Sequence, residues 1–328
     1  MFKKLILLCY SLILFTFFNS AILKADEVEK LRIGSLQYGS VNWELKLIKE
    51  LGLDLKNNFE LEIVELASKN AAAVALQGGA VDMIVTDWFW VSRQRSEGRL
   101  FAFVPHSMAA GGLIVHNDSG ISDLSDLEGK KIGIAGGQVD KSWLIFRTYF
   151  KKKFNKDLRK ESDQIFGAPP LLNKKIKQKS FDAILTYWPY QAKLMTDENF
   201  SKIINITDII QKLDIPKGVP VIGWVFKENW AKQNKTLLDN FLSISDKSKK
   251  LMLESDDIWT KIRPNMNAKS EKLFLNLRDA YREGIPKSSF SDAQISGSTK
   301  LYSILSQIGG KELVGKANEL SPGTFWSK

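Results

Sequence analysis

The sequence predicts an α/β protein of two lobes, in each of which helices flank a mainly parallel sheet. Three observations predict it: short apolar strands alternate with helical patterns, a strand-end pattern occurs twice at an offset of 100 residues, and the chain is long enough for two hydrophobic cores. The composition agrees, because 44% of the 328 residues are hydrophobic and 26% are charged, with 22 Gly and 9 Pro. These proportions exclude collagen-like, low-complexity and disordered chains.

The first 25 residues predict a cleaved secretory signal peptide. Lys3 and Lys4 precede an apolar run over residues 5–18, and small residues follow up to Ala25, after which we expect cleavage. The alternative is a membrane anchor, for which a run of about 14 apolar residues is short. Cleavage removes Cys9, the single cysteine, so we expect neither a disulfide nor thiol chemistry in the mature exported protein.

The first predicted unit alternates strands with helices. Continuous or alternating apolar residues predict strands, and apolar residues about four positions apart predict helices. Ser68 is the expected N-cap of the second helix. In chain order, the predicted elements are a strand over 30–36, a helix through Trp43, Leu47 and Leu51, a strand over 59–66, a helix over 70–77 and a strand over 81–85.

A second unit is predicted to begin near Gly111. Its strand over 132–135 enters a Gly136–Gly137 turn and then a helix over 140–150. Residues 151–180 carry ten basic and three acidic side chains, which we interpret as a solvated face or as a surface that docks on acidic partners or anionic headgroups. Few aromatic residues lie among these lysines, so the pattern does not predict binding to nucleic acid.

The pattern Asp-x-Ile-x-Thr-x-Trp occurs at residues 82–88 and again at residues 182–188. Each copy is a predicted buried strand that ends in a Thr and brings a Trp, Trp88 or Trp188, to the start of the next helix. Ligands of open parallel sheets sit beyond the carboxyl ends of the strands. Two lobes that face each other with these strand ends predict a hinged cleft.

Five segments of the sequence resemble periplasmic solute-binding proteins of ABC importers, in the group for nitrate, sulfonates, taurine and thiamine-pyrimidine precursors. The segments are the signal peptide and residues 31–34, 74–82, 124–134 and 181–183. The resemblance covers most of residues 30–245, and it rests on the order and spacing of the segments. The predicted function is therefore capture of a small solute for an importer.

The resemblance implies the two-lobed type II periplasmic binding fold, in which the chain crosses twice between the lobes. Lobe one is expected to comprise residues 26–110 and 221–328, and lobe two residues 111–220. The hinges are expected near residues 109–113 and 219–223. The region 268–328 reads as helices and loops that pack against lobe one, and its sequence does not reveal a function.

The resemblance also implies a ligand pocket at the facing strand ends. Alternatives remain for its residues: Trp side chains can belong to the core, Asp87 can cap a helix, and the Gly136–Gly137 turn can be an ordinary βα turn instead of an anion cradle. Trp43, Trp90 and Trp143 fit core-facing helix positions. The expected ligand-binding residues are Gln37, Tyr38, Thr86, Asp87, Trp88, Ser107, Gly137, Gln138, Asp140, Tyr187, Trp188 and Trp224, with Met108 and Gly136 nearby.

The predicted pocket favours an amine-bearing organic solute. Tyr and Trp rings favour a flat ring or an organic cation, and a buried Asp87 needs a cationic or hydrogen-bond-donating partner. The expected helix N-terminus at 136–140 favours a sulfonate or carboxylate end, whereas Asp140 opposes it. We therefore expect an aminopyrimidine or a zwitterion such as taurine, ahead of nitrate or sulfate.

The sequence predicts a binding protein rather than an enzyme. A pyrimidine synthase resembles this family, but it relies on cysteine and histidine chemistry, and we place His106 and His116 near the crossover rather than at a strand end. The sequence contains neither a Gly-x-Ser-x-Gly nor a His-Glu-x-x-His motif. A ligand-sensing module is the other alternative. The expected partners are the solute, an ABC permease and its ATPase, and we expect a monomer without a cofactor or a metal site.

Overall fold

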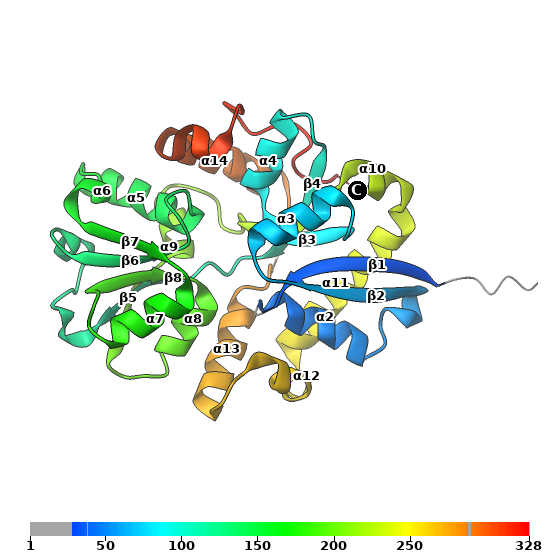
Figure 1. Cartoon of the computed structure of the whole chain (residues 1–328), viewed down its shortest axis with the longest axis horizontal. Helices are drawn as coiled ribbons and strands as arrows, with labels where there is room; N and C mark the ends of the chain where they lie inside the picture. Colours follow the sequence, from blue (N-terminus) through cyan, green and yellow to red (C-terminus); the bar gives the residue numbers. More distant parts are fainter. Residues whose placement is uncertain (1–27, 38, 288–289, 328) are drawn as a thin grey trace, which may run out of the picture.

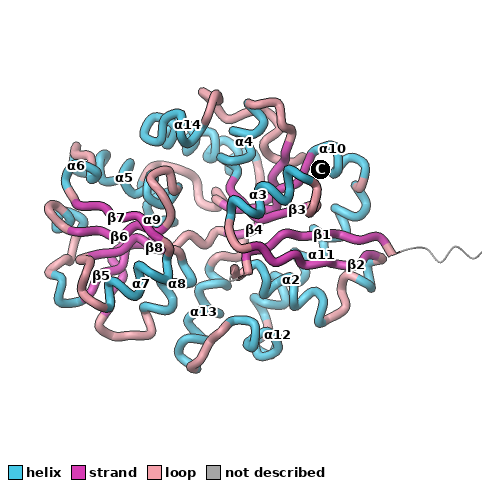
Figure 2. The backbone as a smooth tube through the Cα atoms, viewed as in Figure 1, coloured by secondary structure: helices cyan, strands magenta, loops and turns pink. Residues whose placement is uncertain are grey.

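The computed structural model describes residues 28–37, 39–287 and 290–327. Two five-stranded sheets lie side by side, each with helices on its faces (Figure 1). Figure 2 shows the two groups of strands separated by helices and loops. The predicted signal peptide and Tyr38 lie outside the described residues. No helix of the described part of the chain combines the length and apolar character needed to cross a bilayer.

The first sheet, with the helices that pack on it, is called lobe one. Its strand order is β2-β1-β3-β10-β4. The strands are β1 (Glu29–Leu36), β2 (Phe59–Leu66), β3 (Met83–Asp87), β4 (Phe101–Ser107) and β10 (Ile222–Lys227). The accompanying helices are α2 (Val41–Glu50), η1 (Leu55–Asn57), α3 (Lys69–Gly78), α4 (Trp88–Ser96), α10 (Glu228–Gln233), α11 (Lys235–Glu254), α12 (Asp256–Ile262), η4 (Arg263–Met266), α13 (Glu271–Glu283) and α14 (Asp292–Val314).

The second sheet, with its helices, is called lobe two. Its strand order is β7-β6-β8-β5-β9. The strands are β5 (Gly112–His116), β6 (Lys131–Ala135), β7 (Asp163–Gly167), β8 (Ala183–Thr186) and β9 (Phe200–Asn205). The helices are η2 (Asn117–Ser119), η3 (Leu124–Leu127), α5 (Lys141–Phe154), α6 (Leu158–Glu161), α7 (Pro169–Lys177), α8 (Trp188–Leu194) and α9 (Ile206–Lys212).

Each sheet is mainly parallel, as the sequence predicts, and one antiparallel strand makes it mixed. β1 pairs in parallel with β2 and β3, and β6 pairs in parallel with β7 and β8. β10 runs antiparallel to β3 and β4, and β5 runs antiparallel to β8 and β9. The antiparallel strand of each sheet is the one that follows a connection from the other lobe. Hydrophobic periodicity does not encode strand direction, so the sequence pattern does not identify these two antiparallel strands.

The repeated sequence pattern corresponds to a repeated position in the fold. β3 is the central strand of the first sheet and β8 is the central strand of the second. The predicted strand 81–85 is displaced to 83–87, because the Asp82 carboxylate accepts hydrogen bonds from the backbone and guanidinium of Arg32 before the β3 ladder begins. Both copies of the pattern therefore present their ends at the middle of a sheet edge.

The C-terminal helices contact both lobes, whereas the sequence predicts packing against lobe one. Helix α13 packs against α8 of lobe two, and α14 packs against both α4 and α5. Leu144 of α5 and Leu305 of α14 belong to the same buried hydrophobic cluster as Trp88. The lobes are thus joined by apolar packing in addition to the two chain connections over residues 108–111 and 213–221.

Candidate functional site

Asp87, at the end of β3, makes two contacts that set the centre of the candidate site. Its side chain caps α4, since Oδ1 accepts a hydrogen bond of 2.9 Å from the backbone N–H of Trp90. Its Oδ2 lies 2.8 Å from Nζ of Lys141, the first residue of α5 in lobe two. The predicted capping role is therefore present, and the same carboxylate also holds an ion pair that joins the two lobes.

The environment of this ion pair keeps both partners charged. Burial raises the pKa of Asp87, but the ammonium groups of Lys141 and Lys69 and the Trp90 N–H lower it further, so the resulting pKa is below its ordinary value. Burial lowers the pKa of Lys141, but the Asp87 and Asp140 carboxylates leave it above its ordinary value. The pair is consequently ionic at neutral pH.

Tyr187, at the end of β8, is fixed by a second set of contacts. Its hydroxyl donates a 2.8 Å hydrogen bond to Oδ2 of Asp140, whose Oδ1 caps α5 by accepting from the Ser142 N–H at 2.9 Å. Gly136 has a φ of +91°, and a Cβ there would lie 2.7 Å from the Tyr187 hydroxyl oxygen. Glycine at this turn therefore leaves the room that Tyr187 needs.

A further cation reaches lobe two from lobe one. Nζ of Lys69, the first residue of α3, lies 5.1 Å from the centroid of the Tyr187 ring. Burial raises the pKa of Tyr187 well above its ordinary value, as do the Asp140 and Asp87 carboxylates, so the phenol is neutral. We call Lys69, Asp87, Asp140, Lys141 and Tyr187 the interlobe cluster. Its two cations and two carboxylates suit a polar ligand that carries charges of both signs.

The sequence predicts that Trp88 lines the cleft between the lobes. In the structure Trp88 is a core side chain instead. Its indole is 0% exposed and stacks on Phe89 with ring centroids 3.9 Å apart. The indole N–H donates a 2.7 Å hydrogen bond to the carbonyl oxygen of Pro220. Because the ring packs with Tyr302 of α14 and the N–H has a partner, the side chain is fully accounted for by the core of lobe one.

Trp188, the equivalent residue of lobe two, lies at the interface between the lobes. Its ring meets Trp43 of α2 edge-on at 5.8 Å and Tyr281 of α13 at 6.1 Å. Trp43 itself is buried, as its helix position predicts. Trp188 also lines a pocket, so this half of the repeated pattern presents an aromatic side chain to a cavity.

The pocket beside Trp188 has a volume of about 430 Å³, which is in the range of small-molecule sites. It lies between the 108–111 connection, α8 and the start of α9 in lobe two, and α13. Gly111 in this connection has a φ of +103°, and a Cβ there would lie 2.1 Å from the carbonyl oxygen of Thr186. A side chain at position 111 would collide with this carbonyl oxygen, so glycine is required there. Glycine lets the connection pack closely against the end of β8.

The other predicted site residues are spread over several environments. Gln37, Gly137 and Gln138 are exposed in loops at the strand ends, and Thr86 pairs with Gly223 beside them. Ser107 Oγ accepts from the Ala109 N–H at 3.1 Å and donates to the Gly284 carbonyl oxygen at 3.3 Å. Ser107 therefore holds the connection against the end of α13, while the neighbouring Met108 lines the pocket.

Trp224 is expected among the ligand-binding residues, but in the structure it belongs to the core of lobe one. It is 1% exposed and packs edge-on against His106 at 4.7 Å and Phe241 at 5.0 Å. It lies on the face of the first sheet that α11 covers, because Phe241 belongs to α11. Its position within β10 rather than in a loop explains this burial.

The two histidines lie away from the interlobe cluster. His106, in β4, is buried, and burial together with the Lys249 charge lowers its pKa well below the ordinary value. His116 is the last residue of β5, so the prediction that it lies near the crossover is wrong. β5 begins opposite Thr186 and runs antiparallel to β8, which carries His116 to the far edge of the second sheet.

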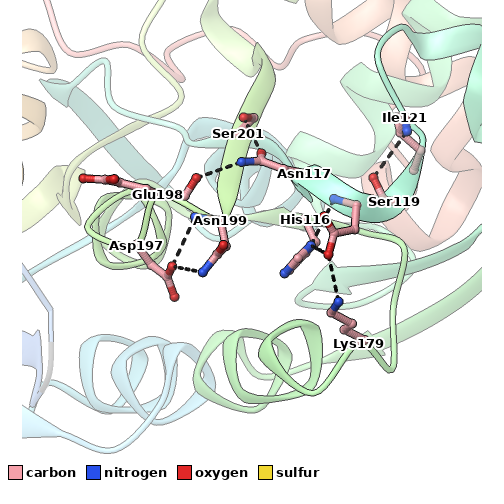
Figure 3. Close-up of polar contacts among 10 residues, drawn as sticks. His116, Asn117, Ser119, Ile121, Lys179, Asp197, Glu198, Asn199 and Ser201 are labelled. Atoms are coloured by element: carbon pink, nitrogen blue, oxygen red, sulfur yellow. Dashed lines mark hydrogen bonds and ion pairs between the residues drawn. The ribbon is translucent and has the colours of Figure 1, made fainter.

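The surroundings of His116 form a loop cluster at that far edge (Figure 3). Its Nδ1 accepts a 3.1 Å hydrogen bond from the Asp118 N–H. Asn117 donates from its side-chain amide to the Glu198 carbonyl oxygen at 2.8 Å and accepts from Ser201 Oγ at 2.7 Å (Figure 3). These contacts connect the loop after β5 to the start of β9, which is a structural role.

Sequence reasoning missed Lys69 and Lys141, although each follows directly after an N-cap residue at the end of a βα turn. It also missed a buried polar network in lobe one. Ser245 Oγ donates to Oε1 of Glu44 at 2.5 Å, and the Tyr281 hydroxyl donates to Oε2 of Glu44 at 3.2 Å. Lys249 donates to Ser245 Oγ at 2.8 Å. This network fixes α13, and with it Tyr281, in contact with Trp188.

The described residues contain no group of three or more His, Cys, Asp or Glu side chains placed to hold a metal ion. The polar groups between the lobes are instead ammonium, carboxylate and phenol groups arranged in pairs. Such groups bind a ligand through hydrogen bonds and charge.

Three of the solved structures with the same fold are bacterial binding proteins. The alkanesulfonate-binding protein SsuA from Xanthomonas axonopodis pv. citri, bound to MOPS, superposes with a TM-score of 0.69 at 15% identity over 90% of this chain and 98% of its own. The periplasmic aliphatic sulphonate binding protein SsuA from Escherichia coli gives 0.71 at 15% identity over 91% and 92%. A ligand-binding component of an ABC-type import system from Staphylococcus aureus gives 0.65 at 14% identity over 91% and 96%. At these identities the likeness establishes the fold.

Comparison at the level of sequence gives the family. No curated protein matches the chain. Residues 49–257 match the family described as NMT1/THI5 like, a span that runs from the end of α2 to the start of α12 and includes every residue of the interlobe cluster. This protein is therefore a member of the NMT1/THI5-like family with a two-lobed periplasmic binding fold.

Proposed function

We propose that this protein is a periplasmic solute-binding protein that encloses a small organic solute between its lobes and delivers it to the permease of an ABC importer. The observation that carries the proposal is the meeting of the end of β3 in lobe one with the start of α5 in lobe two, where Asp87 Oδ2 and Lys141 Nζ lie 2.8 Å apart. The predicted signal peptide over residues 1–25 and the family membership support a place in the periplasm. We keep the predicted lobe limits, 26–110 with 221–328 and 111–220, as part of this proposal.

Capture by closure follows from the distribution of the polar groups. Lobe one supplies Asp87 and Lys69, and lobe two supplies Lys141, Asp140 and Tyr187. A solute that contacts both sets gains more interactions when the lobes are together than when they are apart. It therefore shifts the population toward the closed arrangement, which is the form a permease can recognise.

The proposed solute is an amine-bearing organic molecule, with a zwitterion such as taurine ahead of an aminopyrimidine. The buried Asp87 carboxylate favours an ammonium or amine group. Lys69 and Lys141 add a preference for an anionic end, to which the expected helix N-terminus at 136–140 also contributes. Nitrate and sulfate rank last, because Asp87 and Asp140 repel them and they leave the Trp188 and Tyr187 rings unused.

A thermal-shift screen with small sulfonates, amines, pyrimidines and carboxylates tests the proposal. A ligand that binds only the folded protein adds about 2.7 kcal/mol of stability at a hundredfold excess over Kd. We expect amine-bearing compounds to raise the melting temperature, and Asp87→Asn to reduce that shift. The matched control is Asp214→Asn, which removes a similar Asp–Lys contact of 2.7 Å from the exposed surface.

Two results would overturn the proposal. The absence of a shift with every compound class contradicts capture of such solutes. A shift with nitrate or sulfate alone, equal in the wild type and in Asp87→Asn, contradicts the ranking of the solutes and the role of Asp87.

A further inference from the structure

The Asp87–Lys141 ion pair connects two lobes through groups that are shielded from water. The side chain of Asp87 is 10% exposed and that of Lys141 is 23% exposed. Asp87 is the last residue of β3, the central strand of the first sheet, and the N-cap of α4; Lys141 begins α5, which follows β6 in the second sheet. The contact therefore lies at the strand ends where the proposed solute binds.

Asp87 needs a cationic partner whenever the lobes are together. A carboxylate that is shielded from water is costly unless a positive charge and hydrogen bonds compensate it. The Trp90 N–H satisfies Oδ1, and Lys141 satisfies Oδ2. Among the described residues, Lys141 is the cation within 4.0 Å of this carboxylate, while Lys69 lies over the Tyr187 ring. The second oxygen is therefore occupied by an ammonium group of the protein itself.

We propose that Lys141 is a tethered substitute for the cationic group of the solute, and that an amine-bearing solute binds by displacing its ammonium from Asp87. This inference rests on the proposed function. It adds that Lys141 and the solute compete for the same carboxylate, that of Asp87. Without solute, Lys141 holds the lobes together. With solute, the ammonium of the ligand takes over the contact with Oδ2 of Asp87.

The side chain of Lys141 suits this exchange. Its four-carbon stem lets the ammonium move without a movement of the α5 backbone. The Asp140 carboxylate is close enough to raise the pKa of Lys141, so a displaced ammonium keeps a negative group nearby. It also remains at the edge of the site, where it faces the anionic end of a zwitterion. Lys141 therefore selects for solutes that are strong enough cations to replace it.

Chemical rescue tests the inference with a defined probe. Lys141→Ala removes the atoms from Cγ to Nζ, and propylammonium supplies three carbons and an ammonium in their place. We expect the unliganded Lys141→Ala variant to have a larger radius of gyration in solution scattering than the wild type. Propylammonium should reduce that radius in a saturable manner, and the Lys141→Ala/Asp87→Asn double variant should not respond. Lys141→Met, which keeps the apolar stem, is expected to be as open as Lys141→Ala.

Lys69→Ala is the matched control, because it removes a cation that crosses the same interface but leaves the Asp87–Lys141 contact in place. Propylammonium should leave its radius unchanged. For a hit of the screen that carries an amine and no anionic group, Lys141→Met should lower Kd about tenfold, since the solute no longer competes with a close charge pair. Lys69→Ala should not lower Kd.

The outcomes separate this inference from the proposed function. An unliganded Lys141→Met variant that is as compact as the wild type, or an amine Kd that rises in this variant, overturns the role of Lys141 even when the screen gives hits. Asp87-dependent closure by propylammonium together with a screen that gives no amine hit supports the role of Lys141 and overturns the proposed solute class.

Discussion

The two copies of the Asp-x-Ile-x-Thr-x-Trp pattern occupy equivalent strands but place their final residues in different environments. In lobe one, Trp88 is fully buried beneath α14, whereas in lobe two Trp188 contacts Trp43 and Tyr281 of the other lobe. The backbone position is the same in both, so the packing of neighbouring helices decides which side chain stays accessible. A repeated motif predicts a repeated position in a fold, and it does not predict a repeated role.

The residue between the Thr and the Trp differs in a related way. In lobe one it is Asp87, whose charge crosses to Lys141 of the other lobe. In lobe two it is Tyr187, whose hydroxyl binds Asp140 within the same lobe. The end of β3 therefore provides the ion pair between the lobes, and the end of β8 provides an aromatic ring that is held in place within lobe two.

The largest expected effect is the loss of stability on replacing Trp88, which should exceed the loss on replacing Trp188. Trp88→Ala should lower the free energy of unfolding by about 3–5 kcal/mol, because it leaves a cavity in a packed core and removes the hydrogen bond to Pro220. Urea denaturation followed by circular dichroism measures this change. Trp188→Ala is the comparison and should cost less than half as much, since its ring packs between lobes that can separate. Equal losses for the two variants would contradict the distinction between core and interface.

The next effect concerns the carboxylate between the lobes. Asp87→Asn should lower the free energy of unfolding by about 1.5–3 kcal/mol, because Lys141 loses a charged hydrogen-bond partner while the N-cap of α4 is retained. Denaturant titration measures it, with the exposed Asp214→Asn as control. A loss no greater than that of the control would show that the ion pair contributes nothing to the closed arrangement.

The stability contributed by the Asp87–Lys141 ion pair should also depend on pH. The change with pH should be no larger than the loss caused by Asp87→Asn. The pKa of Asp87 is lowered on folding, so its contribution is complete above the unfolded value of about 3.9 and is lost as pH falls through the lower folded value. The pKa of Lys141 is raised, so its contribution is complete below about 10.4 and is lost as pH rises through the higher folded value.

The difference in unfolding free energy between the wild type and Asp87→Asn should therefore be constant across neutral pH and decrease at both extremes. Denaturant titrations of the two proteins at each pH give this difference, in which the other carboxylates cancel. A maximum near pH 6 instead would assign the pH dependence to a histidine.

The smallest effect belongs to the strand end of lobe two. Tyr187→Phe removes one hydrogen bond to Asp140, which keeps its bond from the Ser142 N–H, so we expect a loss of about 1 kcal/mol. The ring remains under Lys69, and solution scattering should show an unchanged radius. A loss equal to that of Asp87→Asn would make the two strand ends energetically equivalent.

Much of the fold followed from local sequence patterns. The strand predicted over 59–66 has the bounds of β2, and Ser68 caps α3 by accepting from the Ala71 N–H at 3.1 Å. These features depend on residues a few positions apart, for which periodicity and capping preferences are informative. The position of Asp87 at a strand end was predicted for the same reason.

The partners of these strand ends were not predictable in the same way. Lys141 reaches Asp87 and Lys69 reaches Tyr187 only because the two lobes face each other. The burial of Trp88 depends on α14, more than two hundred positions later in the chain. Local sequence patterns do not encode contacts between residues far apart in the chain. The sequence around Trp88 is therefore the same whether or not a distant helix covers its indole ring.

The packing of α14 against both α4 and α5 has a consequence for behaviour in the cold. The contact between α14 and α5 is apolar, and hydrophobic association weakens on cooling. The Asp87–Lys141 contact is electrostatic and does not share that temperature dependence. Cooling is therefore expected to weaken the apolar contact between α14 and α5 relative to the Asp87–Lys141 ion pair.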